Sequence, residues 1–354
     1  MKIAFFTTVF CLGHSKFGIS NAAYFLARHF EERHGSDIDV FAINTGEQKS
    51  DEKLGYINVK RFVPKIRSFF LSGDMLRSGG RHDIIHSFHY GYFPATSGFI
   101  NSIINKTPHI FTPAFHPPIY TFVKKLISWK YGISQGYPII RLSDKTLVFN
   151  EDEKKRLSKY VKGNFKTIPP PVDSRTFYPK RQESGKIRIG FIGPMLSWKG
   201  ALIAADIFSS IQKKRKDVEF VFIGFGPLEN EIRKRGNFKF YKELSPEDVA
   251  MHMNSIDILV SPTKYESFGY VLAEAGMCGT PVVSTRVGAV PETVGEGGIL
   301  VDYGNWTRMK EDIEILIDDE RKRKKLGKNA ISHTKQFRDD EVSEKVYNVY
   351  KSIE

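Results

Sequence analysis

Two glutamates, Glu266 and Glu274, stand eight positions apart in the stretch KYESFGYVLAEAG, residues 264–276. The first follows a short apolar run, and the second lies within an apolar pattern of helical period. Such carboxylates can accept hydrogen bonds from the hydroxyl groups of a ligand, with each acid holding a different part of it. Alternatively, the first acid caps a helix and the second faces solvent. The pair by itself leaves both interpretations open.

A helix that begins near Phe268, Gly269 and Tyr270 would present its first backbone amides to an anion. These amides and the positive end of the helix dipole favour a phosphate group. A matching element, IGFIGPMLSWKG at residues 189–200, is predicted to be a strand, a glycine turn and then Lys199 at the start of a helix. A lysine at that place can neutralise a diphosphate as charge develops on a leaving group. A solvated surface lysine is the alternative.

Short apolar runs rich in β-branched and aromatic residues alternate with helical patterns along the whole chain. This alternation predicts an α/β protein with doubly wound parallel sheets. Strands are expected within KIAFFTTVF, DIDVFAI, INVKRFV, DIIHSF, HIFTPAF and TLVFN in the first half, and within KIRIGFIG, EFVFIGFG, FKFYKEL, DILVSP, TPVVST and GGILVD in the second. In such sheets, ligands bind at the carboxyl ends of the strands.

The join between two domains is expected in PPPVDSRTFYPKRQESG, residues 169–185, where prolines, charges and a glycine replace the periodic pattern. We therefore expect one Rossmann-like domain over residues 1–178 and a second over residues 179–335. A C-terminal helix over residues 336–354 can cross back to the first domain.

The composition is that of a soluble globular protein, with 41% hydrophobic and 26% charged residues. Only Cys11 and Cys278 are present, which argues against a disulfide framework and fits a reducing compartment. The N-terminal residues do not have the pattern of a signal peptide, and no apolar run is long enough to predict a membrane-spanning helix. The net charge is +13: residues 1–180 hold 26 Lys and Arg against 14 Asp and Glu, whereas residues 181–354 hold 27 against 26. An anionic partner is therefore expected at the first half.

Together these motifs resemble the donor half of the family 4 retaining glycosyltransferases, which have the GT-B fold. The resemblance lies in SPTKYESFGYVLAEAGMCGTPVVSTRVGAVPE at residues 261–292, in the KG pair at 199–200 and in GFGPLENE at 224–231. It continues more loosely through GHSKFGISNAAYFLARHF, DIIHSFHYGYFPA, FTPAFHPP, RLSDKTLVFNEDEKKRL and TIPPPVDSRTFYP, and so covers nearly the whole chain. It implies two Rossmann-like doubly wound parallel-sheet domains facing a central cleft, with the acceptor bound by the first and a nucleotide-sugar by the second.

The resemblance also implies a role for each motif residue. Lys199 would bind the diphosphate, Glu266 the hydroxyls of the transferred sugar, and Glu274 the ribose. The implied donor-binding set is Gly18, Gly193, Lys199, Lys242, Leu244, Glu266, Ser267, Phe268, Gly269, Tyr270 and Glu274. The implied catalytic set is Glu266, Lys199, His116 and His89. The two histidines are candidates for contact with the acceptor or the transferred sugar, and a structural hydrogen-bonding role is the alternative for each.

Three positions depart from the family pattern. Pro194 stands where the family usually has an arginine, so that Lys199 would hold the diphosphate alone, or Arg286 or another basic residue would replace that arginine. Phe88 and Ala114 stand where the family often has histidines. These departures keep open the possibility of a non-catalytic binding or scaffold protein with the same fold. A sugar-nucleotide epimerase is the other alternative.

The resemblance implies a metal-independent retaining transferase of the hexosyl type, in which the acceptor attacks the front face of the donor. Such an enzyme mainly positions the acceptor and stabilises the departing diphosphate. A UDP- or GDP-linked sugar is the expected donor, and no cofactor is expected. The acid pairs Asp318-Asp319 and Asp339-Asp340 are expected to be solvated helix ends, and no Cys/His cluster has ligand spacing, so no metal site is expected.

Two stretches that mix aromatic and basic residues, 63–81 and 120–132, predict association with an anionic membrane surface. Ordinary surface helices are the alternative. We therefore expect a cytoplasmic protein, peripheral on the inner face of the membrane, with a lipid-linked sugar, a glycan or another anionic molecule as acceptor. Nucleic acid is disfavoured as a partner because no nucleic-acid-reading motif is present.

Overall fold

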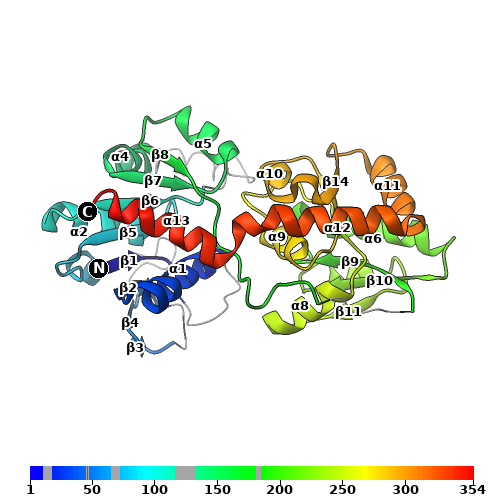
Figure 1. Ribbon diagram of the computed structural model, residues 1–354, viewed down its shortest axis with the longest axis horizontal. Coiled ribbons are helices and arrows are strands. Elements are labelled where there is room, and N and C mark those ends of the chain that lie inside the picture. The colour runs from blue at the N-terminus through cyan, green and yellow to red at the C-terminus, as the bar shows by residue number, and fades with distance from the viewer. Residues whose placement is uncertain (11–17, 45, 47, 65–71, 116–131, 181–184) are drawn as a thin grey trace. The chain divides into compact units, whose positions relative to one another are not determined.

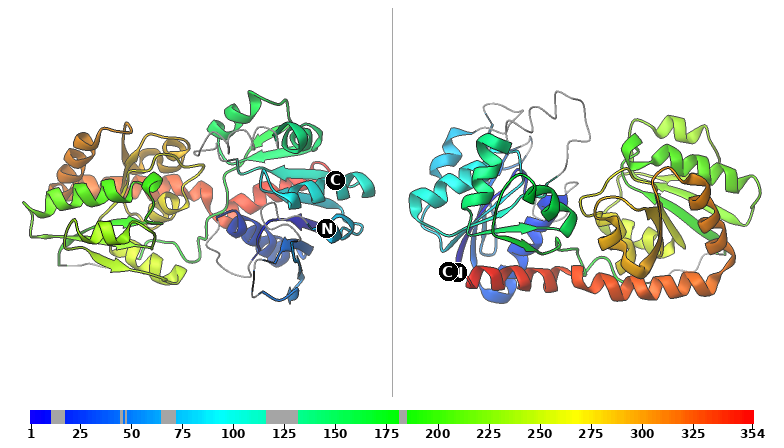
Figure 2. Two further views of the ribbon diagram at one scale, coloured as in Figure 1. Left: turned by 180° about the vertical axis from the view of Figure 1, so that it is seen from behind. Right: turned by 90° about the horizontal axis from the view of Figure 1, so that it is seen from above.

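The structure is a computed structural model, and it describes all residues except 11–17, 45, 47, 65–71, 116–131 and 181–184 (Figure 1). The chain divides into two compact units. Unit 1 comprises Met1–Pro171 with Asp339–Glu354, and unit 2 comprises Val172–Arg338. Each unit is built on its own predominantly parallel sheet, as Figure 2 shows from two further directions.

The sheet of unit 1 has eight strands in the order β3-β4-β2-β1-β5-β6-β7-β8. They are β1 (Lys2–Phe6), β2 (Asp37–Ile43), β3 (Asp51–Leu54), β4 (Ile57–Phe62), β5 (Ile84–Phe88), β6 (His109–Thr112), β7 (Lys145–Val148) and β8 (Phe165–Thr167). All neighbours pair in parallel except β3 with β4. The six strands predicted in this half are confirmed. The edge strands β3 and β8, with the sequences DEKL and FKT, were not expected because they are short and polar.

The helices of unit 1 include one from the far end of the chain. They are α1 (Gly18–His34), α2 (Phe93–Asn105), α4 (Tyr137–Leu142), α5 (Glu151–Ser158) and α13 (Asp339–Lys351). Helix α13 packs against α1, and its Val342, Val346 and Tyr350 belong to the same buried cluster as Phe5 and Phe30 (Figure 1). The last helix therefore completes the core of unit 1.

The sheet of unit 2 has six strands, all parallel, in the order β11-β10-β9-β12-β13-β14. They are β9 (Ile187–Ile192), β10 (Val218–Ile223), β11 (Lys239–Tyr241), β12 (Ile258–Ser261), β13 (Val282–Thr285) and β14 (Gly298–Val301). All six were predicted. Their continuous apolar sequences suit a sheet that helices cover on both faces.

Seven α-helices are described in unit 2: α6 (Ala201–Gln212), α7 (Glu229–Arg233), α8 (Pro246–Ser255), α9 (Tyr270–Met277), α10 (Val290–Val294), α11 (Trp306–Asp318) and α12 (Glu320–Thr334). Local sequence explains where α8 begins, because Ser245 accepts a hydrogen bond from the amide of Asp248 and Pro246 occupies the first helical position. Within the described part of the chain, no helix is long and apolar enough to span a bilayer.

The order of the strands in unit 2 reverses between β9 and β12. From β9 the chain continues outward to β10 and β11, then returns to β12 and proceeds to β13 and β14 on the other side. Strands β9 and β12 are paired through Ile189–Ile258 and Gly190–Leu259. The carboxyl ends of strands at such a reversal are where open α/β sheets bind ligands.

Candidate functional site

Lys199 and Glu266 form an ion pair at the point where the strand order of unit 2 reverses. Lys199 ends the single 3-10 turn Ser197–Lys199 that follows β9, and Glu266 lies in the loop that follows β12. The distance from Lys199 Nζ to Glu266 Oε1 is 2.6 Å, and the two side chains are only 22% and 11% exposed. Partial burial strengthens such a pair relative to one on the open surface. The structure thus brings together two residues that are separated in the sequence by three helices and three strands, α6 to β12.

Backbone contacts hold the loops that carry this pair. The amide of Lys264 donates to the carbonyl of Trp198 at 2.8 Å, and the amide of Ala289 donates to the carbonyl of Glu266 at 2.9 Å. Lys199 Nζ also lies 4.4 Å from the centre of the Trp198 ring, a cation–π distance. The loops after β9, β12 and β13 are therefore tied to one another around Glu266.

Two glycines make this close approach possible. Gly200 has φ 76°, and a Cβ there would lie 2.1 Å from the carbonyl oxygen of Pro262. Gly288 has φ 50°, and a Cβ there would lie 2.3 Å from the carbonyl oxygen of Glu266. Any larger residue would both strain the backbone and push the loops apart.

Helix α9 begins directly after Glu266, with Gly269 as its N-cap at φ 89°. Gly269 was expected within the first turn and instead stands just outside it. Phe268 is 2% exposed and packs edge-on against Phe337, with the ring centres 5.2 Å apart. Its side chain therefore belongs to the buried core, and its backbone leads into the start of α9. The predicted amide seat for a phosphate thus coincides with the start of α9.

Glu274 lies on the second turn of α9 and is partly buried. Burial, and then the charge of Glu274, raise the pKa of the Tyr270 hydroxyl well above its usual range. The same two causes raise the pKa of the Cys278 thiol to about 12. Both groups therefore stay protonated at neutral pH.

The other residues predicted for the donor side have structural partners of their own. Lys242 Nζ lies 2.7 Å from Glu229 Oε1, and Leu244 packs on the small cluster around Ile256. Arg286, the suggested substitute for a missing arginine, approaches Asp302 at 3.9 Å and donates to the carbonyl of Leu300.

Three further members of the set are Gly193, Gly18 and Ser267, and the two glycines are described by their place in the backbone. Gly193 follows β9 with φ 139°, and its neighbour Pro194 is exposed. In unit 1, Gly18 is the first residue of α1. Ser267 lies between Glu266 and Phe268 and is partly buried.

His89 occupies the corresponding reversal point of the unit 1 sheet, where β1 and β5 are neighbours. It follows β5 with φ 80°, and its Nδ1 lies 2.9 Å from Oγ1 of Thr8, which follows β1. Phe88 is buried and stacks on His86, with the ring centres 4.0 Å apart, and Ala114 is buried with φ 46°. These two positions of unit 1 that depart from the family pattern are therefore part of the core, whereas Pro194 of unit 2 is exposed.

Some predictions concern residues outside the described part of the chain. His116 is one of them. Part of the aromatic and basic stretch 63–81 and nearly all of the stretch 120–132 are others. The roles assigned to them stay predictions.

Glu153 is a buried carboxyl that the sequence interpretation passed over. Its two oxygens accept hydrogen bonds from the amides of Phe115 at 2.6 Å and Phe149 at 2.7 Å, so it joins the segments that follow β6 and β7. Burial is the largest influence and raises its pKa to about 7, against the lowering effect of the two amides. A local signal existed: Asn150 caps α5, and Glu153 stands three residues later, as in a capping box.

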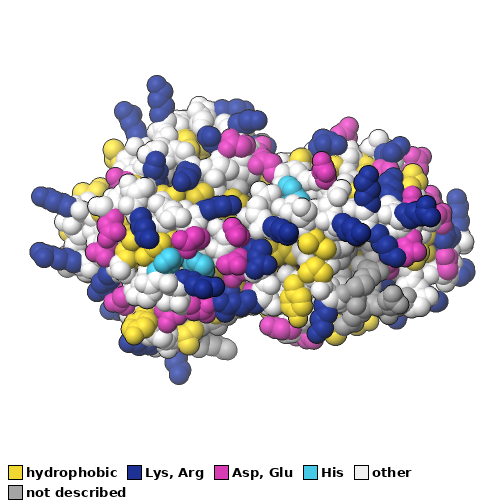
Figure 3. Space-filling view, viewed as in Figure 1, with side chains coloured by type: hydrophobic (Ala, Val, Ile, Leu, Met, Phe, Trp, Pro, Cys, Tyr) yellow, Lys and Arg dark blue, Asp and Glu magenta, His cyan; other side chains and the backbone are white. Residues whose placement is uncertain are grey.

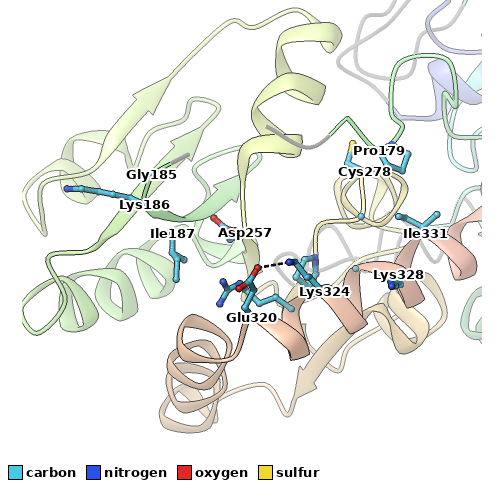
Figure 4. Close-up of a pocket in the computed structure, with 14 residues that line it drawn as sticks. Pro179, Gly185, Lys186, Ile187, Asp257, Cys278, Glu320, Lys324, Lys328 and Ile331 are labelled. Carbon is cyan, nitrogen blue, oxygen red and sulfur yellow. Dashed lines mark ion pairs between the residues drawn. The ribbon is translucent and has the colours of Figure 1, made fainter. Parts of the chain in front are cut away.

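A cavity of unit 2 lies at the opposite end of the parallel strands, where they begin (Figure 4). It has a volume of about 510 Å³ and is lined by Ile187 at the start of β9, by Asp257 and Pro281 directly before β12 and β13, and by residues of α12 such as Lys324. Because it borders the amino ends of these strands, it is separate from the Lys199–Glu266 pair.

Comparison with known proteins gives consistent matches for both units. Residues 174–333 match the family model described as Glycosyl transferases group 1. A D-inositol 3-phosphate glycosyltransferase of Corynebacterium diphtheriae is 36% identical over 374 residues, covering 90% of this chain and 86% of the relative. An uncharacterized glycosyltransferase of Methanocaldococcus jannaschii is 29% identical over 81% of this chain and 80% of its own length. For the D-inositol 3-phosphate glycosyltransferase of Corynebacterium kroppenstedtii, which is 31% identical, the match covers 54% of this chain and 47% of the relative.

Solved structures agree along the whole chain. A sucrose-phosphate synthase of Thermosynechococcus elongatus has a TM-score of 0.79 at 18% identity, covering 99% of this chain and 98% of that one. The Anabaena protein HepE, solved in complex with UDP-glucose, has a TM-score of 0.75 at 17% identity, covering 99% and 100%. At such identities the likeness shows the fold, and the fold is the one predicted from the sequence.

Proposed function

This chain belongs to the glycosyl transferases group 1 family, and we therefore propose that it moves a sugar from a nucleotide-diphosphate donor to an acceptor with retention of anomeric configuration. Its fold is GT-B, and its enzyme class is glycosyltransferase. The observation that carries the proposal is the 2.6 Å ion pair of Lys199 and Glu266 at the strand reversal of unit 2. The ion pair places a cation beside a hydrogen-bond acceptor. A nucleotide-sugar donor needs both, the cation for its diphosphate and the acceptor for the hydroxyls of its sugar.

In the proposed mechanism, Lys199 stabilises the charge that develops on the departing diphosphate. Glu266 accepts hydrogen bonds from hydroxyls of the transferred sugar and holds its reacting carbon towards the acceptor. The ion pair keeps both side chains positioned before the donor arrives, so little reorganisation is needed on binding. Because Lys199 supplies a positive charge to the leaving group, we also propose that the reaction needs no metal ion.

The start of α9 would hold the remaining part of the donor. The amides of Phe268, Gly269 and Tyr270 would bind phosphate or sugar oxygens, and Glu274 would accept hydrogen bonds from the ribose. HepE binds UDP-glucose in a similar fold, which supports a UDP-linked donor; a GDP-linked donor is the other choice. His89, beside Thr8 at the reversal point of unit 1, is the proposed contact to the acceptor or the transferred sugar.

For the acceptor we propose an anionic or lipid-linked molecule, bound by unit 1 at a membrane surface on its cytoplasmic side. The relative from Corynebacterium diphtheriae is named for an acceptor that carries a phosphate, which supports an anionic acceptor here.

The first test is a thermal-shift panel with UDP, GDP, ADP and their sugars. A ligand that binds only the folded protein raises the melting temperature by mass action. With the stabilising donor identified, Lys199→Ala and Glu266→Gln should each reduce kcat on the order of 100-fold or more, because each removes a contact to the reacting groups. Circular dichroism should show both variants folded.

Matched controls are available in the same unit. Lys264 is an exposed lysine close to Glu266, and Glu296 is an exposed acid. Lys264→Ala and Glu296→Gln should keep near wild-type turnover. Wild-type activity in a folded Lys199→Ala or Glu266→Gln protein would defeat the role assigned to that residue. Donor conversion without any acceptor would identify an epimerase instead, and donor binding without turnover would identify a binding protein.

A further inference from the structure

Two histidines and a glutamate from distant parts of the chain converge on the surface of unit 1. His29 and His34 lie on the last turns of α1, and Glu344 lies on the second turn of α13. His29 Nε2 is 3.3 Å and His34 Nε2 is 3.0 Å from the same carboxylate oxygen, Glu344 Oε2. In Figure 3, histidine side chains lie beside acidic side chains over this pair of helices.

The packing around the cluster fixes the direction of its imidazoles. The ring of His34 stacks on Tyr347, with ring centres 3.6 Å apart and planes 3° from parallel. The ring of His29 packs edge-on against Phe30 at 6.3 Å. Because each ring is held by an aromatic neighbour, both Nε2 atoms stay directed at Glu344.

The positions of the ligand atoms suit a small transition-metal ion. One atom from each of the three side chains lies within 4.8 Å of the others. Bonds of about 2.0–2.2 Å to imidazole nitrogen and carboxylate oxygen place tetrahedral ligands roughly 3.3–3.5 Å apart. The two nitrogen–oxygen distances already lie near this separation, and all three atoms lie within 4.8 Å of one another, so small rotations of the three side chains would bring them around one centre.

We propose that His29, His34 and Glu344 form a binding site for Zn²⁺ or a similar divalent transition metal, with water as the fourth ligand. Two imidazoles and one carboxylate are a donor set that Zn²⁺ accepts, and the open fourth position marks an exchangeable surface site. The ion would replace the hydrogen bonds to Glu344 and link α1 directly to α13. It would therefore attach the last helix of the chain more firmly to unit 1, whose core that helix completes.

An ion pair elsewhere between these two helices shows that their contact relies on polar bridges as well as apolar packing. Arg28 of α1 donates to Asp339 of α13 at 2.6 Å, with both side chains mostly buried. The proposed metal site lies on the same pair of helices, and a bound ion would likewise hold α13 against α1. It does not depend on the donor site in unit 2, so its failure would leave the proposed transferase activity unaffected.

The test is a measurement of bound zinc in the full-length protein without an affinity tag. The protein is treated with a chelator, incubated with Zn²⁺ and separated from free metal by gel filtration. The wild type should retain about one equivalent per chain and show a higher melting temperature with Zn²⁺ than without it. Glu344→Gln and His29→Gln should lose the equivalent and the shift. His333→Gln, a histidine of unit 2 that bonds the carbonyl of Glu292, should keep both.

Cobalt provides a readout that does not depend on the stability of the variants. Co²⁺ bound to nitrogen and oxygen ligands should give visible d–d absorption without the intense near-ultraviolet band of thiolate ligation. Absence of retained zinc in the wild type, an unchanged equivalent in a folded Glu344→Gln protein, or a thiolate band from cysteine would each overturn the proposal. If the wild type retains no zinc, the cluster is only a carboxylate in hydrogen-bond contact with two histidines.

Discussion

Two tyrosines whose hydroxyl groups are buried, Tyr350 and Tyr270, differ in the partner of that hydroxyl. Tyr350 in unit 1 has its hydroxyl against Nδ1 of His86, which is also buried. The hydroxyl of Tyr270 at the start of α9 is buried, and among the described residues it has no hydrogen-bond partner. A buried polar group without a partner destabilises the fold, whereas removing one member of a buried hydrogen bond leaves the other unsatisfied.

The two phenylalanine variants should therefore differ in sign. Tyr270→Phe is expected to leave the free energy of unfolding unchanged or to raise it by about 1 kcal/mol, and Tyr350→Phe to lower it by roughly 1–3 kcal/mol. Urea denaturation of both variants beside the wild type measures the contrast. A larger loss for Tyr270→Phe than for Tyr350→Phe would show that the Tyr270 hydroxyl has a partner after all.

At the scale of elements, the turn between β9 and α6 tests how tightly the loops of the site are packed. Gly200→Ala would place a methyl group 2.1 Å from the Pro262 carbonyl and force φ 76° on an alanine. Gly304 is the matched control, because it has φ 100° but no atom within 4 Å of an added Cβ. We expect Gly304→Ala to lower stability by about 1 kcal/mol from backbone strain alone, and Gly200→Ala to lower it by several times more. Equal melting temperatures for the two variants would mean that the β9 and β12 loops separate without cost.

Helix α5 carries a pH dependence through Glu153. The folded state raises the pKa of this carboxyl from 4.5 to about 7, mainly by burial, so it keeps a proton that the unfolded chain releases. Its contribution to stability is therefore complete below about pH 4.5 and is lost as pH rises towards 7.

Glu153→Gln should remove that pH dependence. We expect the free energy of unfolding of the wild type, relative to the variant, to fall by up to about 3 kcal/mol between pH 4.5 and 8. Urea denaturation of both proteins at several pH values measures the difference between their free energies of unfolding. The contributions of the other titrating groups are the same in both proteins and cancel in this difference. A constant difference across this range would place the pKa of Glu153 near its ordinary value.

At the scale of the whole molecule, the structure redistributes the charge. The sequence halves differ sharply, but α13 brings its acidic residues into unit 1. Unit 1 then holds 26 Lys and Arg against 18 Asp and Glu, and unit 2 holds 27 against 22. Both units are therefore positive, and the net charge by itself does not single out unit 1 as the place where an anionic partner binds.

Electrostatic association with anionic membranes should follow from this charge. Sedimentation with vesicles at low salt should recover more protein with anionic than with neutral lipid, and the excess should decline as salt is added, because screening weakens the attraction. Equal recovery with both kinds of vesicle at low salt would remove the membrane proposal and leave a soluble anionic acceptor.

The sequence by itself determined the local elements of this protein. The twelve predicted strands, the glycine turn before Lys199 and the helix that carries Glu274 all depend on residues within a few positions of one another, through apolar periodicity and turn chemistry. Comparison of motifs then indicated which residues the site would use. Glu153 lay within reach of the same reasoning, since its place after the cap of α5 is a local signal.

Only the tertiary structure decided which of these residues meet. Lys199 reaches Glu266 because β9 pairs with β12 rather than with another strand, and His29 and His34 reach Glu344 because the last helix packs on the first. Neither pairing has a local signal, since each depends on which apolar faces bury one another across long stretches of chain. Strand order and helix docking minimise exposed apolar surface for a whole unit at once, and the distances between remote side chains follow from that.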